Sequence, residues 1–286
     1  MSKGWERLES GRISDILRSK RYFEQLVELH WEYYSELAFQ RNQIREQLKS
    51  SLRDKAQPFA FPRWQRIVRY KYSLVPLSTK GSLVDPGGRF NVGDIDRARY
   101  PAFPALYIAS DKGTALAEVL GRQESAGSLT PEELALTKPD SITAVSVSGK
   151  LESVIDIRGR DNLGGFVNLI KDFRLSKSLI VKARRFRFPL RLVRTTTELG
   201  AALEQPDWRN WPMVYDVPST CQVFGSLVMN AGIEGILYSS TITQRACLAI
   251  FPQNFLNSSS FIELDDAVPD AKVQRRIDSG NFKDVI

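Results

Sequence analysis

The feature that most constrains the fold is a change of pattern near residue 58. Residues 13 to about 56 carry apolar and aromatic side chains in steps of three or four, the spacing of one helix face. Pro58 and Pro62 then end this pattern, because proline lacks a backbone donor and clashes with the preceding helical turn. We therefore predict a helical N-terminal region over residues 1–58.

After this break, short apolar segments alternate with helical ones. Strands are predicted at residues 66–75, 105–109, 142–148, 151–157, 184–193, 234–240 and 246–253, and helices at 111–121 and 221–232. Gly149 and Lys150 would form the turn between two of the strands. The segments follow no strict strand–helix–strand order, so we expect an α+β domain with a mixed sheet over residues 59–260. Residues 261–286 are expected to form a polar tail that packs loosely.

The composition excludes several kinds of chemistry. His30 is the only histidine among 286 residues, which removes histidine-based triads and the usual histidine general base. The only cysteines, Cys221 and Cys247, lack metal-binding spacing, so neither a metal site nor a disulfide framework is expected. Any reaction must then use carboxylates, hydroxyls, tyrosines and arginines.

Charge and hydropathy bear on the cellular compartment of the protein and on its partners. No apolar run approaches the ~20 residues of a membrane helix, and the first residues lack the apolar core of a secretory signal. We therefore expect a cytoplasmic protein without a membrane partner. The net charge of +7 suits a phosphorylated ligand, but it is modest for this length, and direct binding of nucleic acid is not expected. A homo-oligomer is left open.

The segment DPGGRFNVG, residues 85–93, places an arginine directly after two glycines. Glycine lets a backbone bend tightly or approach a ligand closely. The guanidinium group of Arg89 could therefore bind a phosphate or carboxylate through paired hydrogen bonds, or the segment could be an ordinary surface turn. Four further candidates are Arg69 in the first predicted strand, Tyr107, Glu118 and Ser240. Each could also have a purely structural role.

Taken in order, the segments GGRFN, LYIAS, TALAEV and GILYSS resemble the RES domain family over about residues 63–256. The resemblance implies a fold similar to that of ADP-ribosyltransferases of the diphtheria-toxin type. Many RES proteins are toxins that degrade NAD+, and their partner is often a helix-turn-helix antitoxin. By position, Arg69 and Arg89 match the two arginines of the family, and Tyr107, Glu118 and Ser240 match its tyrosine, glutamate and serine. Ser239 stands where the family usually has proline, and the N-terminal region lies outside the pattern.

This resemblance gives each candidate a role towards NAD+, which would be a substrate rather than a bound cofactor. The arginines would bind the pyrophosphate, and the turn containing Gly88 and Asn91 would let backbone N–H groups approach the phosphates or ribose. Glu118 would stabilise positive charge on the ribose, Tyr107 would stack on a ring, and Ser240 would bind the nicotinamide amide or orient the glutamate. Two alternatives remain open: transfer of ADP-ribose to a macromolecule, and a non-catalytic module that binds nucleic acid or protein.

Overall fold

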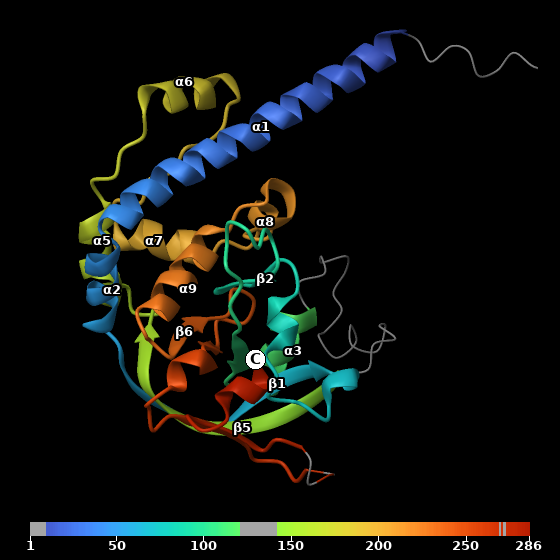
Figure 1. Cartoon of the computed structure of the whole chain (residues 1–286), viewed down its shortest axis with the longest axis vertical. Coiled ribbons are helices and arrows are strands. Elements are labelled where there is room, and N and C mark those ends of the chain that lie inside the picture. The colour runs from blue at the N-terminus through green and yellow to red at the C-terminus, as the bar shows by residue number, and fades with distance from the viewer. Residues whose placement is uncertain (1–9, 121–141, 269, 271–272) are drawn as a thin grey trace, which may run out of the picture.

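The computed structural model describes residues 10–120, 142–268, 270 and 273–286 (Figure 1). The helices are α1 (Ser10–Gln43), α2 (Arg45–Arg53), α3 (Lys112–Leu120), α5 (Gly164–Ile170), α6 (Lys177–Arg185), α7 (Thr196–Leu203), α8 (Asn210–Tyr215) and α9 (Thr220–Asn230). The strands are β1 (Gln57–Arg69), β2 (Gly87–Gly88), β3 (Asn91–Val92), β4 (Leu106–Ala109), β5 (Ile142–Asp156), β6 (Gly235–Ser239), β7 (Ala246–Ile250), β8 (Phe261–Leu264) and β9 (Arg276–Ile277). The predicted α+β class with a helical N-terminal region is confirmed.

Among the described residues, seven strands form one mixed sheet in the order β1-β4-β7-β6-β5-β8-β9. β1 also pairs with β5, so the first five strands of this order close on themselves. β5 and β6 run parallel, whereas the other pairs are antiparallel. β2 and β3 form a separate two-stranded hairpin.

The proline segment lies within a strand. Pro58 and Pro62 fall inside β1, each at a point where its register with β5 shifts. Such irregularities are where a strand tolerates proline, because the missing N–H is then not needed by the ladder. β1 ends at Arg69, so the strand predicted for residues 66–75 begins about nine residues earlier than expected and also ends earlier.

Gly149 is not a turn. β5 runs through it without interruption, where two strands were predicted, and Gly149 pairs with Phe61 of β1 and Ile262 of β8. A Cβ at this position would lie 2.5 Å from the carbonyl oxygen of Phe261 and 2.6 Å from the Phe61 ring. The glycine therefore permits close packing in the middle of one long, curved strand (Figure 1).

Side chains alternate between two apolar clusters on the two faces of the sheet. Ile236 and Tyr238 of β6 belong to the cluster under α2, α5, α7 and α9, whereas Leu237 belongs to the cluster that includes the C-terminal residues. This alternation follows from the two-residue period of a strand. The strands predicted at 105–109, 234–240 and 246–253 are confirmed as β4, β6 and β7, although β7 ends at Ile250, three residues before its predicted end.

The C-terminal segment packs closely, contrary to the expectation of a loose tail. Its strands β8 and β9 extend the sheet beyond β5, and Ile262 and Ile277 are fully buried. The main-chain oxygen of Val285 accepts hydrogen bonds from the N–H and the hydroxyl of Thr79. The few apolar residues of this segment are spaced so that nearly all of them reach the second cluster.

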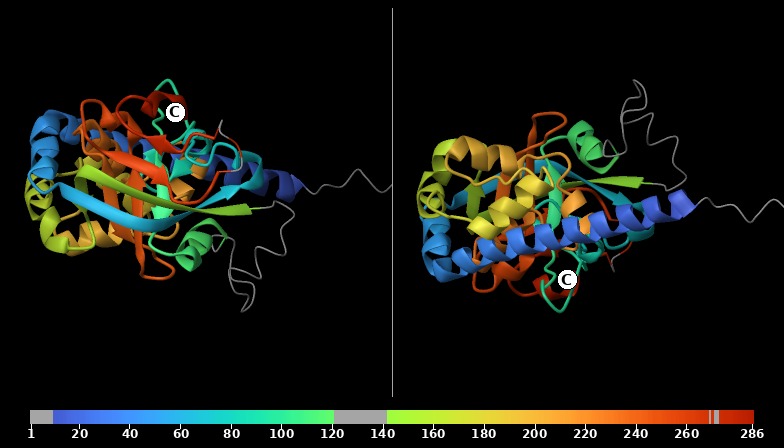
Figure 2. Two further views of the ribbon diagram at one scale, coloured as in Figure 1. Left: turned by 90° about the horizontal axis from the view of Figure 1, so that it is seen from below. Right: turned by 90° about the horizontal axis from the view of Figure 1, so that it is seen from above.

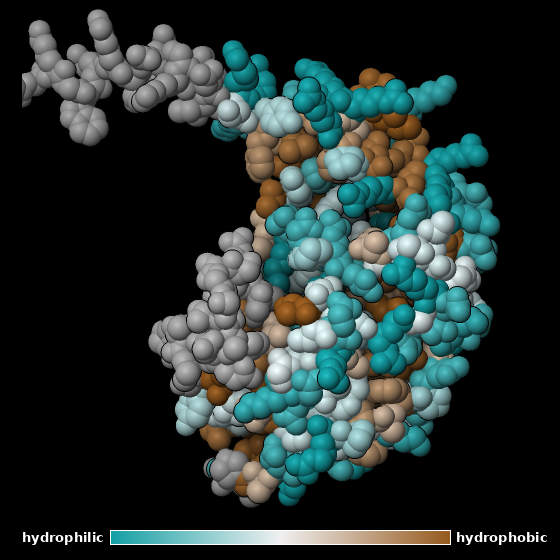
Figure 3. All heavy atoms as spheres, turned by 180° about the vertical axis from the view of Figure 1, so that it is seen from behind, coloured by the Kyte–Doolittle hydropathy of each residue, from teal (hydrophilic) through white to brown (hydrophobic). Residues whose placement is uncertain are grey.

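The N-terminal helices pack along the helical side of the domain (Figure 2). α1 and α2 are separate helices, because Ile44 leaves helical geometry at φ −117° and ψ 23°. The segment predicted as a strand at 184–193 is instead the end of α6 followed by irregular chain, and its Phe186 and Phe188 pack against α1. Figure 3 shows apolar side chains gathered at the end of the molecule where α1 and α6 lie. No helix in the described part of the chain is long and apolar enough to cross a membrane.

Candidate functional site

The GGRFN segment forms the β2–β3 hairpin, with Arg89 and Phe90 at its tip. Gly87 has a φ of +90°, a value that favours glycine. A Cβ on Gly88 would lie 2.4 Å from the hydroxyl oxygen of Tyr107, so only glycine leaves room for that side chain. Arg89 and Phe90 are 5% and 1% exposed. The hairpin is therefore part of the core, and the interpretation as an ordinary surface turn is wrong.

Asn91 fixes this hairpin to its surroundings. Its Oδ1 accepts hydrogen bonds from Gly88 N and from the Tyr107 hydroxyl, both at 2.9 Å. Its Nδ2 donates to the carbonyl oxygens of Ser82 at 2.7 Å and Phe103 at 3.0 Å. Asn91 is fully buried and its amide is satisfied on both sides, so in this conformation it positions the hairpin and Tyr107.

Arg89 connects the hairpin to two other segments. Its Nη1 donates to the carbonyl oxygens of Leu203 at 3.2 Å and Gln205 at 3.3 Å. Its Nη2 lies 3.4 Å from Thr241 Oγ1. Its Nε is buried and has no hydrogen-bond partner among the described residues. Most of the guanidinium is therefore used within the protein, and one buried donor remains unsatisfied.

Glu118 and Ser240 meet across 122 residues of sequence. Glu118 is half-buried on α3, and Ser240 is fully buried directly after β6. The Ser240 hydroxyl donates to Glu118 Oε1 at 2.7 Å and accepts the N–H groups of Ile242 and Thr243, each at 3.2 Å. Because Arg89 reaches Thr241, the residue after Ser240, the arginine hairpin and the Glu118–Ser240 pair belong to one continuous cluster.

A second contact, which the sequence pattern did not indicate, holds α3 to the same loop. Thr114 Oγ1 lies 2.8 Å from Asp111 Oδ2 and 3.0 Å from Thr243 Oγ1. Burial favours the neutral form of Asp111, but hydrogen bonds from Thr114 and Ser110 outweigh it and lower the pKa of the Asp111 carboxyl. Asp111 also accepts the N–H of Thr114 at 2.9 Å, as predicted for the start of this helix, whose predicted end at Gly121 lies outside the described residues.

Gln222 is the main residue that sequence reasoning missed. It is fully buried on α9, and its Nε2 contacts the carbonyl oxygens of Pro86 at 2.7 Å, Asn91 at 3.1 Å and Gly88 at 3.3 Å. One turn further along α9, a Cβ on Gly225 would lie 2.0 Å from the carbonyl oxygen of Phe90. α9 therefore packs directly against the hairpin and supports it. The available signal was a glutamine in the otherwise apolar stretch CQVFG.

Arg69 is not drawn into this cluster. It is exposed at the last position of β1, opposite Ile142, and its side chain makes no hydrogen bond or ion pair with other described residues. Arg66, three residues earlier, contacts the strand of Tyr107 instead, because its guanidinium donates to the carbonyl oxygen of Tyr107 at 3.1 Å and to those of Pro76 and Ser78 at 2.8 Å. Burial lowers the pKa of Arg66 to about 10.

Comparison with known proteins identifies the family. The sequence profile of the RES domain matches residues 63–266, well over half of the chain. The chain belongs to the RES domain family. No curated protein matches the chain. A similar solved structure is the M. tuberculosis MbcT–MbcA toxin–antitoxin complex, with 15% identity, a TM-score of 0.45, and coverage of 84% of this chain and 97% of that chain. At this similarity no residue role is transferred from it.

The RES domain of this chain contains every candidate site residue and extends slightly further than the sequence pattern indicated. Its match runs to residue 266 and includes strand β8 (Phe261–Leu264), which the sequence assigned to the tail. Helices α1 and α2 lie before the matched region. The described residues contain no group of three or more histidine, cysteine, aspartate or glutamate side chains able to hold a metal ion.

Proposed function

We propose that this RES domain consumes NAD+ by cleaving the bond between nicotinamide and ribose, and that it acts as the toxin of a toxin–antitoxin pair. Family membership supports the proposal, and the 2.7 Å hydrogen bond between Ser240 and Glu118 carries it. This bond places a half-buried carboxylate beside the arginine hairpin, in a chain whose only histidine lies elsewhere, in contact with Tyr215. The expected protein partner is a helix-turn-helix antitoxin.

The reaction suits a site without histidine. When the bond between ribose C1′ and the nicotinamide nitrogen breaks, its electron pair stays with nicotinamide, which leaves as a neutral molecule and needs no strong general acid. Positive charge develops on the ribose, as in glycoside cleavage. A fixed carboxylate close to that charge stabilises the transition state, and we assign this role to Glu118. Water would then bond to C1′ and release its proton to solvent.

Ser240 is best suited to orienting Glu118. Its hydroxyl hydrogen goes to the carboxylate, and its oxygen accepts two backbone N–H groups. This arrangement leaves little capacity for the nicotinamide amide. The hydroxyl of Tyr107 likewise contacts Asn91 and the N–H of Phe90, so we propose that Tyr107 contributes the face of its ring by stacking on nicotinamide or ribose.

The two arginines differ in what they offer to a pyrophosphate. Arg89 could bind a phosphate only if its bonds to the carbonyl oxygens of Leu203 and Gln205 were replaced, so in this conformation it acts as a positioning residue. Arg69 lies outside the cluster in this conformation, but its side chain is exposed and it matches an arginine of the RES sequence pattern, so we propose it as the pyrophosphate ligand. Replacing Arg69 with alanine should then raise the KM for NAD+ while kcat changes little.

Product analysis tests the proposed reaction. The purified chain is incubated with NAD+ and nicotinamide release is followed, first in buffer, then with phosphate, then with an extract of macromolecules. Free ADP-ribose would identify water as the acceptor, ADP-ribose 1-phosphate would identify phosphate, and labelled macromolecules would identify a transferase. A folded chain that releases no nicotinamide under any of these conditions would contradict the proposal.

A further inference from the structure

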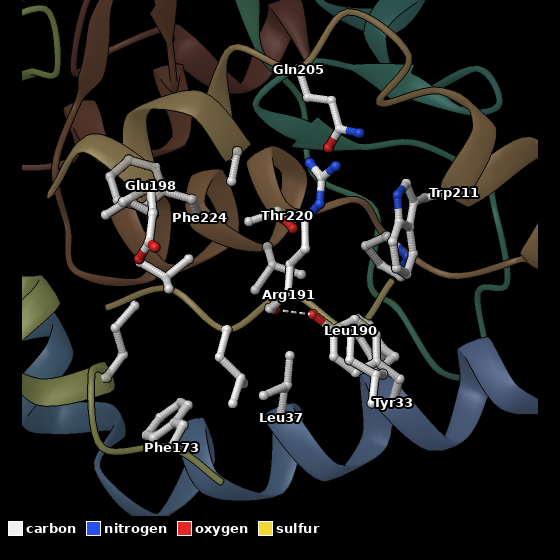
Figure 4. A pocket seen from close by; sticks show the side chains of 18 of the residues that line it. Tyr33, Leu37, Phe173, Leu190, Arg191, Glu198, Gln205, Trp211, Thr220 and Phe224 are labelled. Carbon is white, nitrogen blue, oxygen red and sulfur yellow. Dashed lines mark hydrogen bonds between the residues drawn. The ribbon is translucent and has the colours of Figure 1, made fainter. Parts of the chain in front are cut away.

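A cavity of about 730 Å³ lies between α1 and the helices of the RES domain (Figure 4). Side chains from α1, α5, α7, α8 and α9 line it, together with the irregular segment 188–193. Arg89, Tyr107, Glu118 and Ser240 are not among its lining residues. Its volume falls in the range of small-molecule pockets, so the cavity is a second candidate site beside the one described above.

One wall of the cavity is aromatic. The ring of His30 stacks on Tyr215 with 3.5 Å between centroids, and it meets Phe188 edge-on at 4.4 Å and Trp211 at 5.2 Å. Burial lowers the pKa of His30, while the His30 Nδ1 contact with the carbonyl oxygen of Leu26 opposes this only in part. The wall therefore offers flat apolar surface without a positive charge near neutral pH.

Two arginines in the lining have no acidic partner among the described residues. Arg41 lies over the Tyr34 ring at 5.5 Å, and its pKa is lowered because burial outweighs the nearby tyrosines Tyr34 and Tyr33. Arg191 is exposed, and its main-chain oxygen accepts the hydroxyl of Tyr33. Figure 4 shows the Arg191 side chain reaching across the cavity towards Gln205. Both arginines are close enough to Tyr33 to lower the pKa of its hydroxyl, although burial raises that pKa overall.

The two carboxylates of the lining do not neutralise these arginines. Glu198 accepts the backbone N–H groups of Arg194 at 2.6 Å and Thr195 at 3.0 Å, and so is used in capping α7. No ion pair joins Asp207 to Arg41 or Arg191. Arg41 is partly desolvated and has no counter-ion among the described residues, which is unfavourable, and an anionic ligand in the cavity would relieve that cost.

We propose that this cavity binds a small molecule with one anionic group and an apolar, preferably aromatic, body. The anion, a carboxylate, sulfonate or phosphate, lies at Arg191, Arg41 adds positive charge to the same lining, and the body lies against the wall of His30, Phe188 and Trp211. Guanidinium groups form paired hydrogen bonds with such anions, and aromatic rings stack on one another. The site is distinct from the proposed NAD+ site.

A matched pair of dyes tests the charge requirement on the full chain. 8-Anilinonaphthalene-1-sulfonate has an aromatic body and an anion, whereas N-phenyl-1-naphthylamine has a similar body without the charge. We expect saturable binding of the sulfonate with one site per chain, at least about ten-fold tighter than the neutral dye, because hydrogen bonds to charged groups are the stronger ones. Equal affinity for the two dyes would overturn the proposal.

Variants then locate the site. Arg191→Ala should weaken the sulfonate dye about ten-fold or more and leave the neutral dye unchanged. Arg194→Ala is the matched control, since Arg194 is exposed on the same stretch of chain but does not line the cavity. Ala202→Phe, which fills part of the cavity, should weaken both dyes. Equal affinities in the Arg191 and Arg194 variants, or displacement of the dye by NAD+, would overturn the proposal of a separate anion site.

Discussion

Replacing Gln222 with alanine should destabilise the protein because it removes the support of the arginine hairpin. Gln222 is fully buried, and its amide contacts three carbonyl oxygens of the hairpin, those of Pro86, Gly88 and Asn91. Its Oε1 also accepts the N–H of Ser219 at 3.0 Å, at the start of α9. Alanine would remove this partner from all of these backbone groups in a partly buried region, where the Pro86 carbonyl oxygen would keep only the N–H of Gly93 at 3.3 Å.

The expected loss of stability in Gln222→Ala follows from the number of hydrogen bonds that the Gln222 amide can fully satisfy. An amide has two N–H groups, so the contacts at 2.7 Å and 3.1 Å are the two that it can fully satisfy. A buried polar group left unsatisfied costs about 1–3 kcal/mol. Two such groups give a loss of roughly 2–4 kcal/mol, allowing for some entry of water. In a protein of this size, that corresponds to a fall in Tm of about 5–10 °C.

Urea denaturation measures this loss, with Gln274→Ala as the control. Gln274 is half-buried and makes one long, exposed hydrogen bond of 3.4 Å, so its replacement should change stability by less than about 0.5 kcal/mol. Gln222→Glu keeps the shape of the side chain but places a carboxylate against carbonyl oxygens, and it should be less stable than Gln222→Ala at neutral pH. If Gln222→Ala stayed within about 0.5 kcal/mol of the wild type, the support assigned to Gln222 would be wrong.

Three further outcomes are expected. Gly225→Ala should cost more than about 2 kcal/mol in urea denaturation, because its methyl group would lie 2.0 Å from the Phe90 carbonyl oxygen, and an unchanged midpoint would disprove that close packing. Burial lowers the pKa of His30, so protonation favours the unfolded chain and stability should fall as the pH drops below about 6.5. The variant His30→Phe should show a smaller loss of stability between about pH 7 and 5, and a loss equal to that of the wild type would contradict this expectation. Ser240→Ala should lower kcat for NAD+ cleavage about ten-fold or more with little change in KM, because Glu118 loses a charge-assisted hydrogen bond, whereas a normal kcat would remove Ser240 from the site.

Local pattern was sufficient for part of the fold. β4, β6 and β7 are short apolar runs between turn residues, and α9 is followed by Gly232 at a φ of +80°, as its sequence indicated. Pro58, Pro62 and Gly149 were misjudged for a common reason. Each is a local breaker whose place in β1 or β5 is decided by pairing with a distant strand.

The candidate site was likewise predictable from the sequence only in part. The sequence grouped Arg89, Tyr107, Glu118 and Ser240, and the structure places them in one cluster. The sequence could not show that main-chain carbonyl oxygens would bind Arg89, because every residue has such an acceptor and residue type does not reveal which one is used, here that of Leu203. Nor could strand spacing decide that Arg66, rather than Arg69, faces the strand of Tyr107.

The most direct test of the central claim is the rate of nicotinamide release from NAD+ by the wild type, Glu118→Gln and Glu46→Gln. Glu46 is an exposed helix glutamate paired with Lys49, so its variant controls for the loss of one carboxylate. We expect Glu118→Gln to retain the wild-type Tm and to lose at least about a hundred-fold in kcat, with Glu46→Gln unchanged. A folded Glu118→Gln variant that releases nicotinamide at the rate of the wild type would contradict the account.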